Sequence, residues 1–373
     1  MRIGVPKEIK KQEHRIGLTP DSVKTLTSKG HEVFVEKNGG FEAGFTDENY
    51  KNAGAKILEK ANEVFQSSDL IVKVKEPQES EVEMIRENQI IYTYFHLAAA
   101  KKLTEGLIKS KSVCIAYETV TDNNGKLPLL APMSAVAGRM SIQAGAHSLE
   151  KNQKGRGLLL GGAPGVDSAN VVILGGGVVG ENAALIATGM RAKVSIIDKS
   201  SKRLDELSKK FGKKIEPILS DKADLNKLLK DCDLLIGGVL VPGAEAPKLV
   251  TKEMIKLMKR GSVVVDVAID QGGCIETSKP TTHDNPTFLV DDVVHYCVAN
   301  MPGGVPRTST MALNNATLPL LHEIADNGYK KTLINNKNYM AGLNVYKGKI
   351  TYKNVAEAFG LKYIPAEDIL KNK

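Results

Sequence analysis

The sequence predicts an α/β protein with two domains, each built around a mainly parallel sheet. Strand-like and helix-like runs alternate along residues 1–130. Residues 171–198 have the pattern of a strand, a glycine-rich turn, a helix and a second strand. Two long helical stretches, residues 132–151 and 308–325, could carry the chain from the first region to the second and back. This order of elements is typical of α/β domains in which one domain is inserted into another.

Length and composition agree with a globular protein. The chain has 373 residues, enough for two domains with separate cores, and 42% of them are hydrophobic and 25% charged. The most apolar region, residues 157–190, is interrupted by charged residues and glycines, so we expect no membrane partner. The N-terminus enters directly into a strand-like run, which together with the reduced cysteines expected below predicts a cytoplasmic location.

Charge and cysteine usage exclude two further classes of site. The net charge is +8, but the lysines are spread over mixed-charge helices without an arginine-rich run, so we predict no nucleic-acid partner. The four cysteines form no CxxC pair and show no metal-ligand spacing, so we predict no metal site and expect them to be reduced and mostly buried.

We place the first domain at residues 1–130 plus 306–373. Its strand-like runs are residues 2–5, 32–36, 70–74, 90–94 and 113–116. Its helix-like runs are residues 21–29, 47–53, 79–85 and 99–110. The second long helix returns the chain to this domain, which residues 326–373 then complete.

We place the second domain at residues 131–305, inserted into the first. Its βα pattern runs through residues 171–190, 194–211, 234–236, 263–267 and 287–290. Both domains are therefore expected to be Rossmann-like and to be linked by the two long helices. A small-molecule site is expected in the cleft between two such domains.

The glycine-rich turn predicts a dinucleotide site. Gly175 permits a tight turn, Gly177 lets the backbone approach a pyrophosphate, and Gly180 lets the helix pack closely on its strand. The N–H groups at the start of this helix suit phosphate oxygens.

The second strand of this unit ends at Asp198, at about the spacing where a carboxylate meets the adenosine ribose. A carboxylate there would repel a 2′-phosphate, which favours NAD over NADP. Lys199, Lys202 and Arg203 follow closely and weaken this preference, although basic residues after such a strand are more often a solvated helix start.

Three basic residues of the first domain could serve chemistry. Arg15 lies in a polar loop after the first strand and could grip a carboxylate with its planar fork, although a surface arginine is the simpler interpretation. Lys75 ends a strand-like run, where ligand sites of α/β sheets open, or it is a solvated strand end. His96 ends another such run and could pass a proton, or it is a satisfied core histidine.

The second domain adds further candidates. Asp266 lies inside a strand and Asp270 just beyond it, and because an ionised acid is costly in a core, at least one should face a cleft or have a partner. Residues 237–243 would bring flexible backbone towards a nicotinamide. Ser134 could contact the cofactor or cap the helix that begins near it.

Taken together, these residues resemble the alanine dehydrogenase family along the whole chain. The segments that carry the resemblance are long and unusual in composition: GVPKEIKKQEHRIGLTP near the N-terminus, GGAPGVDSANVVILGGGVVGENAALIATGMRAKVSIID, DVAIDQGGCIETSKPTTHDNPTF and NMPGGVPRTSTMALNNATLP. They are far more specific than the glycine motif alone.

The resemblance implies reversible NAD-dependent oxidative deamination of L-alanine to pyruvate and ammonium, with hydride passing from Cα to nicotinamide C4. By position, His96 and Asp270 would be the acid/base groups. The substrate-binding residues would be Arg15, Lys75, Tyr94, Asn300 and Met301. The cofactor-binding residues would be Ser134, Gly175, Gly177, Val178, Val179, Gly180, Asp198, Lys199, Arg203, Ser220, Val239, Leu240, Ile269, Asp270, Val298 and Met301. The family also implies a homohexamer.

Three alternatives remain open at this point. The soluble NAD(H)-binding component of a proton-translocating transhydrogenase resembles the same family, but this chain keeps the substrate-binding positions. A saccharopine-type dehydrogenase would need additional anionic anchors for its larger substrate. A catalytically silent NAD-sensing module would turn over no amino acid.

Overall fold

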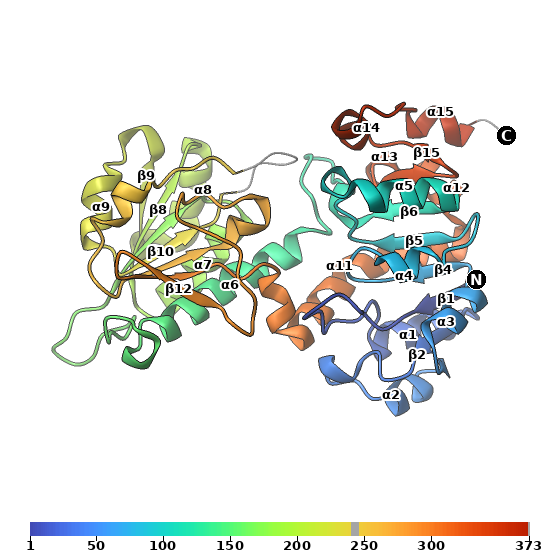
Figure 1. The fold of residues 1–373 in the computed structure, drawn as a ribbon, viewed down its shortest axis with the longest axis horizontal. Helices are drawn as coiled ribbons and strands as arrows, with labels where there is room; N and C mark the ends of the chain where they lie inside the picture. Colours follow the sequence, from blue (N-terminus) through green and yellow to red (C-terminus); the bar gives the residue numbers. More distant parts are fainter. Residues whose placement is uncertain (240–245, 372–373) are drawn as a thin grey trace. The chain divides into compact units, whose positions relative to one another are not determined.

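The computed structural model describes residues 1–239 and 246–371. The chain divides into two compact units, which we call the first unit (Met1–Pro132 with Val305–Lys373) and the second unit (Met133–Gly304). Both chain termini belong to the first unit (Figure 1). Within the described ranges, no helix combines the length and apolar character needed to cross a membrane.

The first unit contains an eight-stranded sheet in the order β15-β14-β6-β5-β4-β1-β2-β3. Strands β1 to β6 are mutually parallel, whereas β14 and β15 are antiparallel additions at one edge. The bounds are β1 (Arg2–Val5), β2 (Glu32–Glu36), β3 (Lys56–Leu58), β4 (Leu70–Val72), β5 (Ile90–Thr93), β6 (Val113–Ala116), β14 (Leu343–Tyr346) and β15 (Lys349–Ile350).

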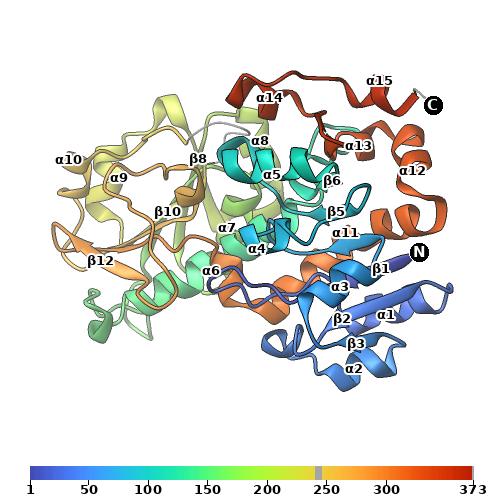
Figure 2. The same cartoon turned by 45° about the vertical axis from the view of Figure 1, so that its right-hand side comes forward.

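Helices surround this sheet, as Figures 1 and 2 show for α1 to α5 and for α11 to α15. Their bounds are α1 (Pro20–Thr27), α2 (Asp47–Asn52), α3 (Ala61–Ser67), α4 (Glu79–Val82), α5 (Lys101–Ser110), α11 (Pro306–Asn327), α12 (Tyr329–Asn335), α13 (Lys337–Met340), α14 (Lys353–Phe359) and α15 (Ala366–Lys371). Local chemistry sets several of these boundaries. At α1, for example, the Thr19 hydroxyl accepts from the Ser22 N–H at 3.2 Å and Pro20 occupies the first turn.

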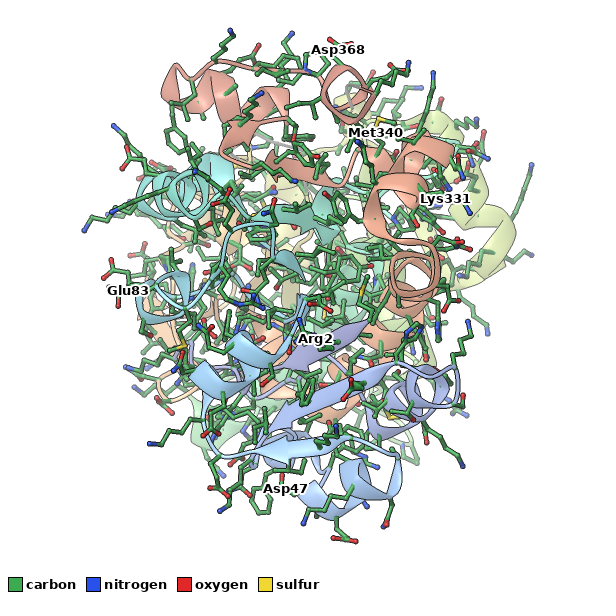
Figure 3. The ribbon with its side chains drawn as sticks, turned by 90° about the vertical axis from the view of Figure 1, so that its right-hand side faces the viewer. Arg2, Asp47, Glu83, Lys331, Met340 and Asp368 are labelled. Atoms are coloured by element: carbon green, nitrogen blue, oxygen red, sulfur yellow. The ribbon has the colours of Figure 1, made fainter. Side chains whose placement is uncertain are left out.

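Figure 3 labels several charged residues at the outside of this unit, among them Glu83, Lys331 and Asp368, which are exposed. Arg2, labelled there at the start of β1, forms an exposed ion pair with Asp69 at 2.6 Å. The chain just beyond β4 and β5 carries Lys75 and His96, which belong to the site described below.

The second unit contains a seven-stranded sheet in the order β12-β13-β11-β10-β7-β8-β9. All neighbours are parallel except β12 and β13. The strands are β7 (Asn170–Leu174), β8 (Lys193–Asp198), β9 (Ile215–Leu219), β10 (Leu234–Gly237), β11 (Val263–Asp266), β12 (Thr287–Val290) and β13 (Val293–Tyr296). The helices are α6 (Ala131–Ser148), α7 (Val178–Gly189), α8 (Ser201–Phe211), α9 (Leu225–Asp231) and α10 (Lys252–Ile255).

Both sheets place their first six strands in the order 3-2-1-4-5-6, counting from β1 in the first unit and from β7 in the second, with β13 as the sixth strand there. This is the Rossmann order, so the predicted fold class is confirmed. One detail of the sequence interpretation is wrong: residues 287–290 do not start another βα unit, because β12 turns directly into the antiparallel β13.

Burial explains why the strands of the second unit read as continuous apolar runs. Val171 and Ile173 of β7 belong to one buried cluster, whereas Val172 and Leu174 belong to another. Alternate residues of a strand face opposite sides of a sheet, so both faces of this sheet are covered.

Candidate active-site residues

The strand order of the first unit defines a candidate site at the carboxyl edge of its sheet. From β1 the chain crosses to β2 on one side, and from β4 it crosses to β5 on the other. Ligands of open α/β sheets bind at this switch point, outside the carboxyl ends of the strands. Arg15 follows β1, Lys75 follows β4 and His96 follows β5, so the fold brings the three predicted basic residues to the same edge.

Arg15 is buried, so the simpler interpretation as a surface arginine is wrong: only 2% of the residue is exposed. Its Nε and one terminal nitrogen each lie 2.6 Å from an oxygen of Glu13. Burial opposes the charge of Arg15, but the Glu13 carboxylate outweighs it and holds the pKa of Arg15 above its ordinary value. The site therefore contains a fixed, permanently charged fork.

The loop that carries Arg15 also lines a pocket. Seven of its residues, from Lys7 to Arg15, form one wall of a cavity of about 240 Å³, and Gly39 and Glu42 form the other. The volume suits a small molecule. Arg15 and Glu13 are both part of the lining, so a cation and an anion face the same space.

Lys75 is half-buried, three residues beyond the end of β4. Its carbonyl accepts from the Thr93 hydroxyl at 3.0 Å and its N–H donates to Glu8 at 3.4 Å. The backbone of Lys75 is thus fixed on both sides by neighbouring segments of the sheet.

His96 is exposed, which excludes the interpretation as a buried core histidine. Its backbone is in the left-handed region, with φ of 51°, and its ring stacks on Tyr94 at 5.9 Å between centroids and 8° between planes. Tyr94 is itself buried and donates its hydroxyl to the Leu129 carbonyl at 2.6 Å. Burial raises the pKa of Tyr94 far above its ordinary value, so this phenol stays protonated and acts as a fixed support for the imidazole.

The glycines of the second unit have the environments that a dinucleotide turn requires. Gly175 has a φ of 94°, which L side chains rarely adopt. A Cβ at Gly180 would lie 1.8 Å from the Gly175 carbonyl oxygen, whereas one at Gly177 would meet nothing within 4 Å. Gly177 also precedes α7 without a side-chain cap, so the helix start offers backbone N–H groups beside open space. Val178 is exposed there and Val179 is buried.

Asp198, at the end of β8, is hydrogen-bonded to the same glycine turn. Its carboxylate accepts from the Gly176 N–H at 2.7 Å and from the Ser200 N–H at 2.8 Å. Arg203 donates to the Gly176 carbonyl at 2.6 Å and forms ion pairs with Glu181 and Glu206. Its charge is therefore balanced within the unit, which removes one of the reasons to expect a 2′-phosphate.

Two further predicted residues follow the carboxyl ends of β8 and β9. Lys199 follows Asp198 and is exposed. Ser220 is exposed directly after β9, whose last residue pairs with Asp198. Both lie at the carboxyl edge of the sheet.

The two acids at the end of β11 have different environments. Asp266 has no exposed surface and accepts backbone N–H bonds from Ala268 at 3.1 Å and Ile275 at 3.2 Å. Burial raises the pKa of Asp266. Asp270 is exposed on the short helix Val267–Gln271, whereas the preceding Ile269 is buried. Asp266 therefore holds the loop after β11 through backbone hydrogen bonds, whereas Asp270 is in contact with solvent.

The remaining predicted residues occupy mixed positions. Val298 and Met301 are 1% and 2% exposed and belong to a buried cluster of the second unit. Asn300, between them in sequence, has a φ of 61°, and its carbonyl lies 3.2 Å from Nε2 of His283.

Val239 and Ser134 complete the set. Val239 is half-buried after β10, and Leu240 lies outside the described residues. Ser134 is inside α6, which begins at Ala131, so the interpretation of Ser134 as a helix cap is wrong.

Sequence reasoning missed the carboxylates behind the basic residues: Glu8, Glu13, Glu81 and Glu118. The available signal was Lys73, a charge inside the apolar run LIVKVK. This lysine is fully buried between Glu8 and Glu81, at 3.0 Å and 2.7 Å. A charge buried directly after a strand requires a buried partner.

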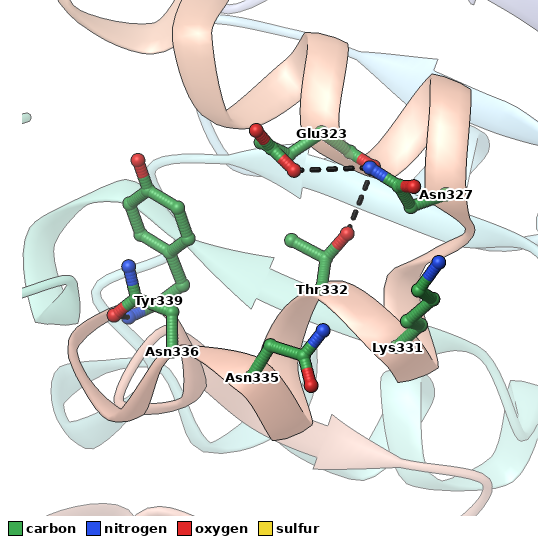
Figure 4. A pocket seen from close by; sticks show the side chains of 7 residues that line it. All are labelled: Glu323, Asn327, Lys331, Thr332, Asn335, Asn336 and Tyr339. Carbon is green, nitrogen blue, oxygen red and sulfur yellow. Dashed lines mark hydrogen bonds between the residues drawn. The ribbon is translucent and has the colours of Figure 1, made fainter.

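A second pocket lies elsewhere on the first unit. It has a volume of about 270 Å³ and is formed by residues of α11 to α13 together with Asn336 (Figure 4). Its polar walls satisfy one another in part: Asn327 donates to the Glu323 carboxylate at 3.0 Å and Thr332 to the Glu323 carbonyl at 2.8 Å. None of the predicted site residues lines it.

Comparison with known families covers almost the whole chain. The family model described as "Alanine dehydrogenase/PNT, N-terminal domain" matches residues 4–137, and the model described as "Alanine dehydrogenase/PNT, C-terminal domain" matches residues 141–353. An alanine dehydrogenase of Halomonas elongata is 54% identical over 370 residues, which are 99% of this chain and 100% of the relative. An alanine dehydrogenase of Methanococcus maripaludis is 54% identical over 371 residues, with the same coverage of both chains.

Solved structures give the same result. An L-alanine dehydrogenase superposes with a TM-score of 0.93 at 50% identity, covering 96% of this chain and 99% of that one. A transhydrogenase from Sinorhizobium meliloti superposes with a TM-score of 0.83 at 22% identity, covering 94% and 100%. At that identity the second likeness supports the fold alone.

Proposed function

Because the chain belongs to the alanine dehydrogenase/PNT family, we propose that it catalyses the NAD-dependent oxidative deamination of L-alanine and its reversal. The balanced reaction is L-alanine, NAD⁺ and water to pyruvate, ammonium, NADH and a proton. The observation that carries this proposal is the 54% identity to an alanine dehydrogenase over the full length of both chains. A transhydrogenase component is the weaker alternative, because its likeness is 22% identity.

The second unit supplies residues that fit NAD. The open space at Gly177 and the uncapped start of α7 suit a pyrophosphate, and Asp198 suits the adenosine ribose. The remaining proposed contacts are Ser134, Gly175, Val178, Val179, Gly180, Lys199, Arg203, Ser220, Val239, Leu240, Ile269, Asp270, Val298 and Met301. NAD, when held by these residues, would supply the acceptor for the hydride of alanine Cα.

The first unit supplies the substrate anchors. The Arg15 fork is proposed to hold the carboxylate of alanine or pyruvate through charge-assisted bonds, and Lys75 to hold the carbonyl oxygen that pyruvate carries. Tyr94 is proposed to support the substrate side through the His96 ring stacked on it. Asn300 and Met301 are proposed as further substrate contacts.

Two groups are proposed to move protons. In the deamination direction the alanine amine must lose a proton before hydride leaves Cα, and water must lose a proton when it adds to the resulting imine carbon. His96 and Asp270 are exposed, reach solvent and are assigned to these transfers. Collapse of the carbinolamine then releases ammonium as the C–N bond breaks.

The experiment mixes the protein with NAD and L-alanine at alkaline pH and follows the absorbance of NADH. L-alanine is expected to give NADH, and D-alanine, L-serine and L-lysine in parallel reactions are expected to give far less. Absence of NADH with L-alanine would overturn the proposal, and faster turnover of L-lysine would favour a saccharopine-type enzyme. Light scattering tests the further proposal that the protein is a homohexamer.

A further inference from the structure

Strands β4 and β5 end in the same unusual way. Each continues a few residues beyond its ladder to a proposed reactive side chain, Lys75 after β4 and His96 after β5. In each extension, two consecutive backbone N–H groups donate to one carboxylate from a neighbouring segment of the sheet. Glu8 receives the pair from Val74 and Lys75, and Glu118 receives the pair from Phe95 and His96.

Glu8 is itself held by a buried cation. One of its oxygens accepts from the Val74 N–H at 2.6 Å and from the Lys75 N–H at 3.4 Å. The other accepts from the Lys73 ammonium at 3.0 Å, and this ammonium also donates to Glu81 at 2.7 Å. All three side chains are at most 2% exposed. The direction in which the chain leaves β4 is therefore fixed by a dry ionic network.

Glu118 holds a backbone that would otherwise be disfavoured. Its Oε1 accepts from the His96 N–H at 2.6 Å and from the Phe95 N–H at 3.1 Å, and its Oε2 accepts from the same Phe95 N–H at 3.3 Å. His96 has a φ of 51°, in the left-handed region, and begins the short helix Leu97–Ala99. Residues other than glycine adopt this region only where the surroundings determine it. Glu118 therefore binds the backbone of the residue that takes this conformation and of the residue before it.

We propose that Glu8 and Glu118 are positioning residues for Lys75 and His96. Each carboxylate accepts from the backbone N–H of the reactive residue and from that of the residue before it, and so fixes the direction of the reactive side chain. This inference rests on the proposed function, because it assigns Lys75 to substrate binding and His96 to proton transfer. The two carboxylates act through different residues, so their variants should affect different kinetic constants.

The side chain of Glu118 allows length and charge to be separated. Glu118→Gln keeps the length and the Oε1 that accepts both N–H groups at the shorter distances. It loses the charge and places an NH₂ group where Oε2 lies 3.3 Å from the Phe95 nitrogen. Glu118→Asp keeps the charge, but its carboxylate is one methylene short of the two N–H groups. If Glu118 acts by position, the glutamine variant should retain kcat within about threefold, whereas the aspartate variant should lose about 10- to 100-fold, the cost of a displacement of roughly 1 Å.

An amide replacement is more disruptive at Glu8 than at Glu118, because one oxygen of Glu8 accepts from the Lys73 ammonium while the other accepts from the backbone. Glu8→Gln would turn an NH₂ group towards either the ammonium or the N–H pair. We expect this variant to raise KM for L-alanine and for pyruvate about tenfold or more, with a smaller change in kcat. The KM for NAD should not change, because the proposed NAD residues lie in the second unit.

Glu63 is the matched control. Its Oε2 also accepts two consecutive backbone N–H groups, from Glu59 at 3.0 Å and Lys60 at 3.2 Å, but these follow β3, the edge strand that β1 and β2 separate from β4. Glu63→Ala should leave kcat and both KM values within about twofold. NAD-binding stoichiometry and circular dichroism, measured on every variant, report the fraction of folded protein.

The experiment is steady-state kinetics of wild type, Glu118→Gln, Glu118→Asp, Glu8→Gln and Glu63→Ala in both directions. Greater activity of the glutamine than of the aspartate variant at position 118, with a KM effect at position 8, supports the inference. Equal or reversed activity of the two Glu118 variants overturns it, whether or not Glu8→Gln folds. A wild-type protein that forms no NADH from L-alanine refutes the proposed function instead, so the two failures are distinguishable.

Discussion

Replacing Lys73 by methionine should cost several kcal/mol of stability, with a strong dependence on pH. Lys73 is fully buried and lies 3.0 Å from Glu8 and 2.7 Å from Glu81. Burial, the largest influence on Glu8, raises the pKa of its carboxyl even with the ammonium present. Without the lysine, two carboxyl groups would share a dry site, and at least one of them must bind a proton.

The magnitude follows from that proton. Holding a glutamic acid of ordinary pKa in its protonated form costs about 4 kcal/mol at pH 7 and about 1 kcal/mol at pH 5. The first value agrees with the roughly 3–5 kcal/mol expected when one partner of a buried ion pair is removed. The folded variant binds more protons than the unfolded chain, so its stability falls as pH rises from 5 to 7.

The assay is hydrogen exchange of the β4 and β5 amides, which reports the local free energy of opening without assuming that both units unfold together. Lys56→Met is the control, because Lys56 pairs with Glu32 at 2.7 Å while both side chains are more than half exposed. That variant should lose less than about 1 kcal/mol at either pH. A Lys73→Met penalty that is no larger than the control, or equal at pH 5 and pH 7, would refute the reasoning.

Three further predictions concern other parts of the chain. Gly180→Ala should lower the melting temperature and NAD affinity together, because its Cβ would lie 1.8 Å from the Gly175 oxygen, whereas Gly177→Ala should fold normally and lose only NAD affinity; equal melting temperatures for the two variants would contradict this. Arg15→Lys should raise KM for pyruvate at least about tenfold, because an ammonium lacks the guanidinium fork that is proposed to hold the substrate carboxylate while it binds Glu13; an unchanged KM would exclude Arg15 as the anchor. Burial lowers the pKa of His295, which lies 2.7 Å from the Thr277 hydroxyl, so wild-type stability should fall as pH drops below about 6.5, and thermal melts of His295→Gln should show a flatter pH profile.

Most of the fold could be predicted because buried parallel strands are continuous apolar runs. Val171–Leu174, for example, faces two cores and reads as an unbroken strand before its glycine turn. The hairpin of β12 and β13 was not predicted, because residues 291 and 292 carry no glycine and both turn residues have positive φ as aspartates. The antiparallel pairing of β12 with β13 depends on this turn, which the residue types do not indicate.

The candidate site could be predicted only in part. The sequence places Arg15, Lys75 and His96 after strands, and the strand order then brings these strand ends to one edge. It does not reveal that Arg15 is buried, since a charged loop residue normally points into solvent. Glu13, its buried partner, is two residues away and reads as part of the same charged loop. The roles of Glu8 and Glu118 depend on contacts 66 and 22 residues away in sequence, which no local pattern contains.

The most direct test of the proposed chemistry follows a labelled hydrogen. Wild-type protein is incubated with NAD and L-alanine deuterated at Cα, and the reduced coenzyme is analysed by mass spectrometry, with methyl-deuterated alanine as the control. One deuterium in NADH from the Cα-labelled substrate, and none from the methyl-labelled one, is the predicted result. Unlabelled NADH from the Cα-labelled alanine, or no NADH, would contradict the account.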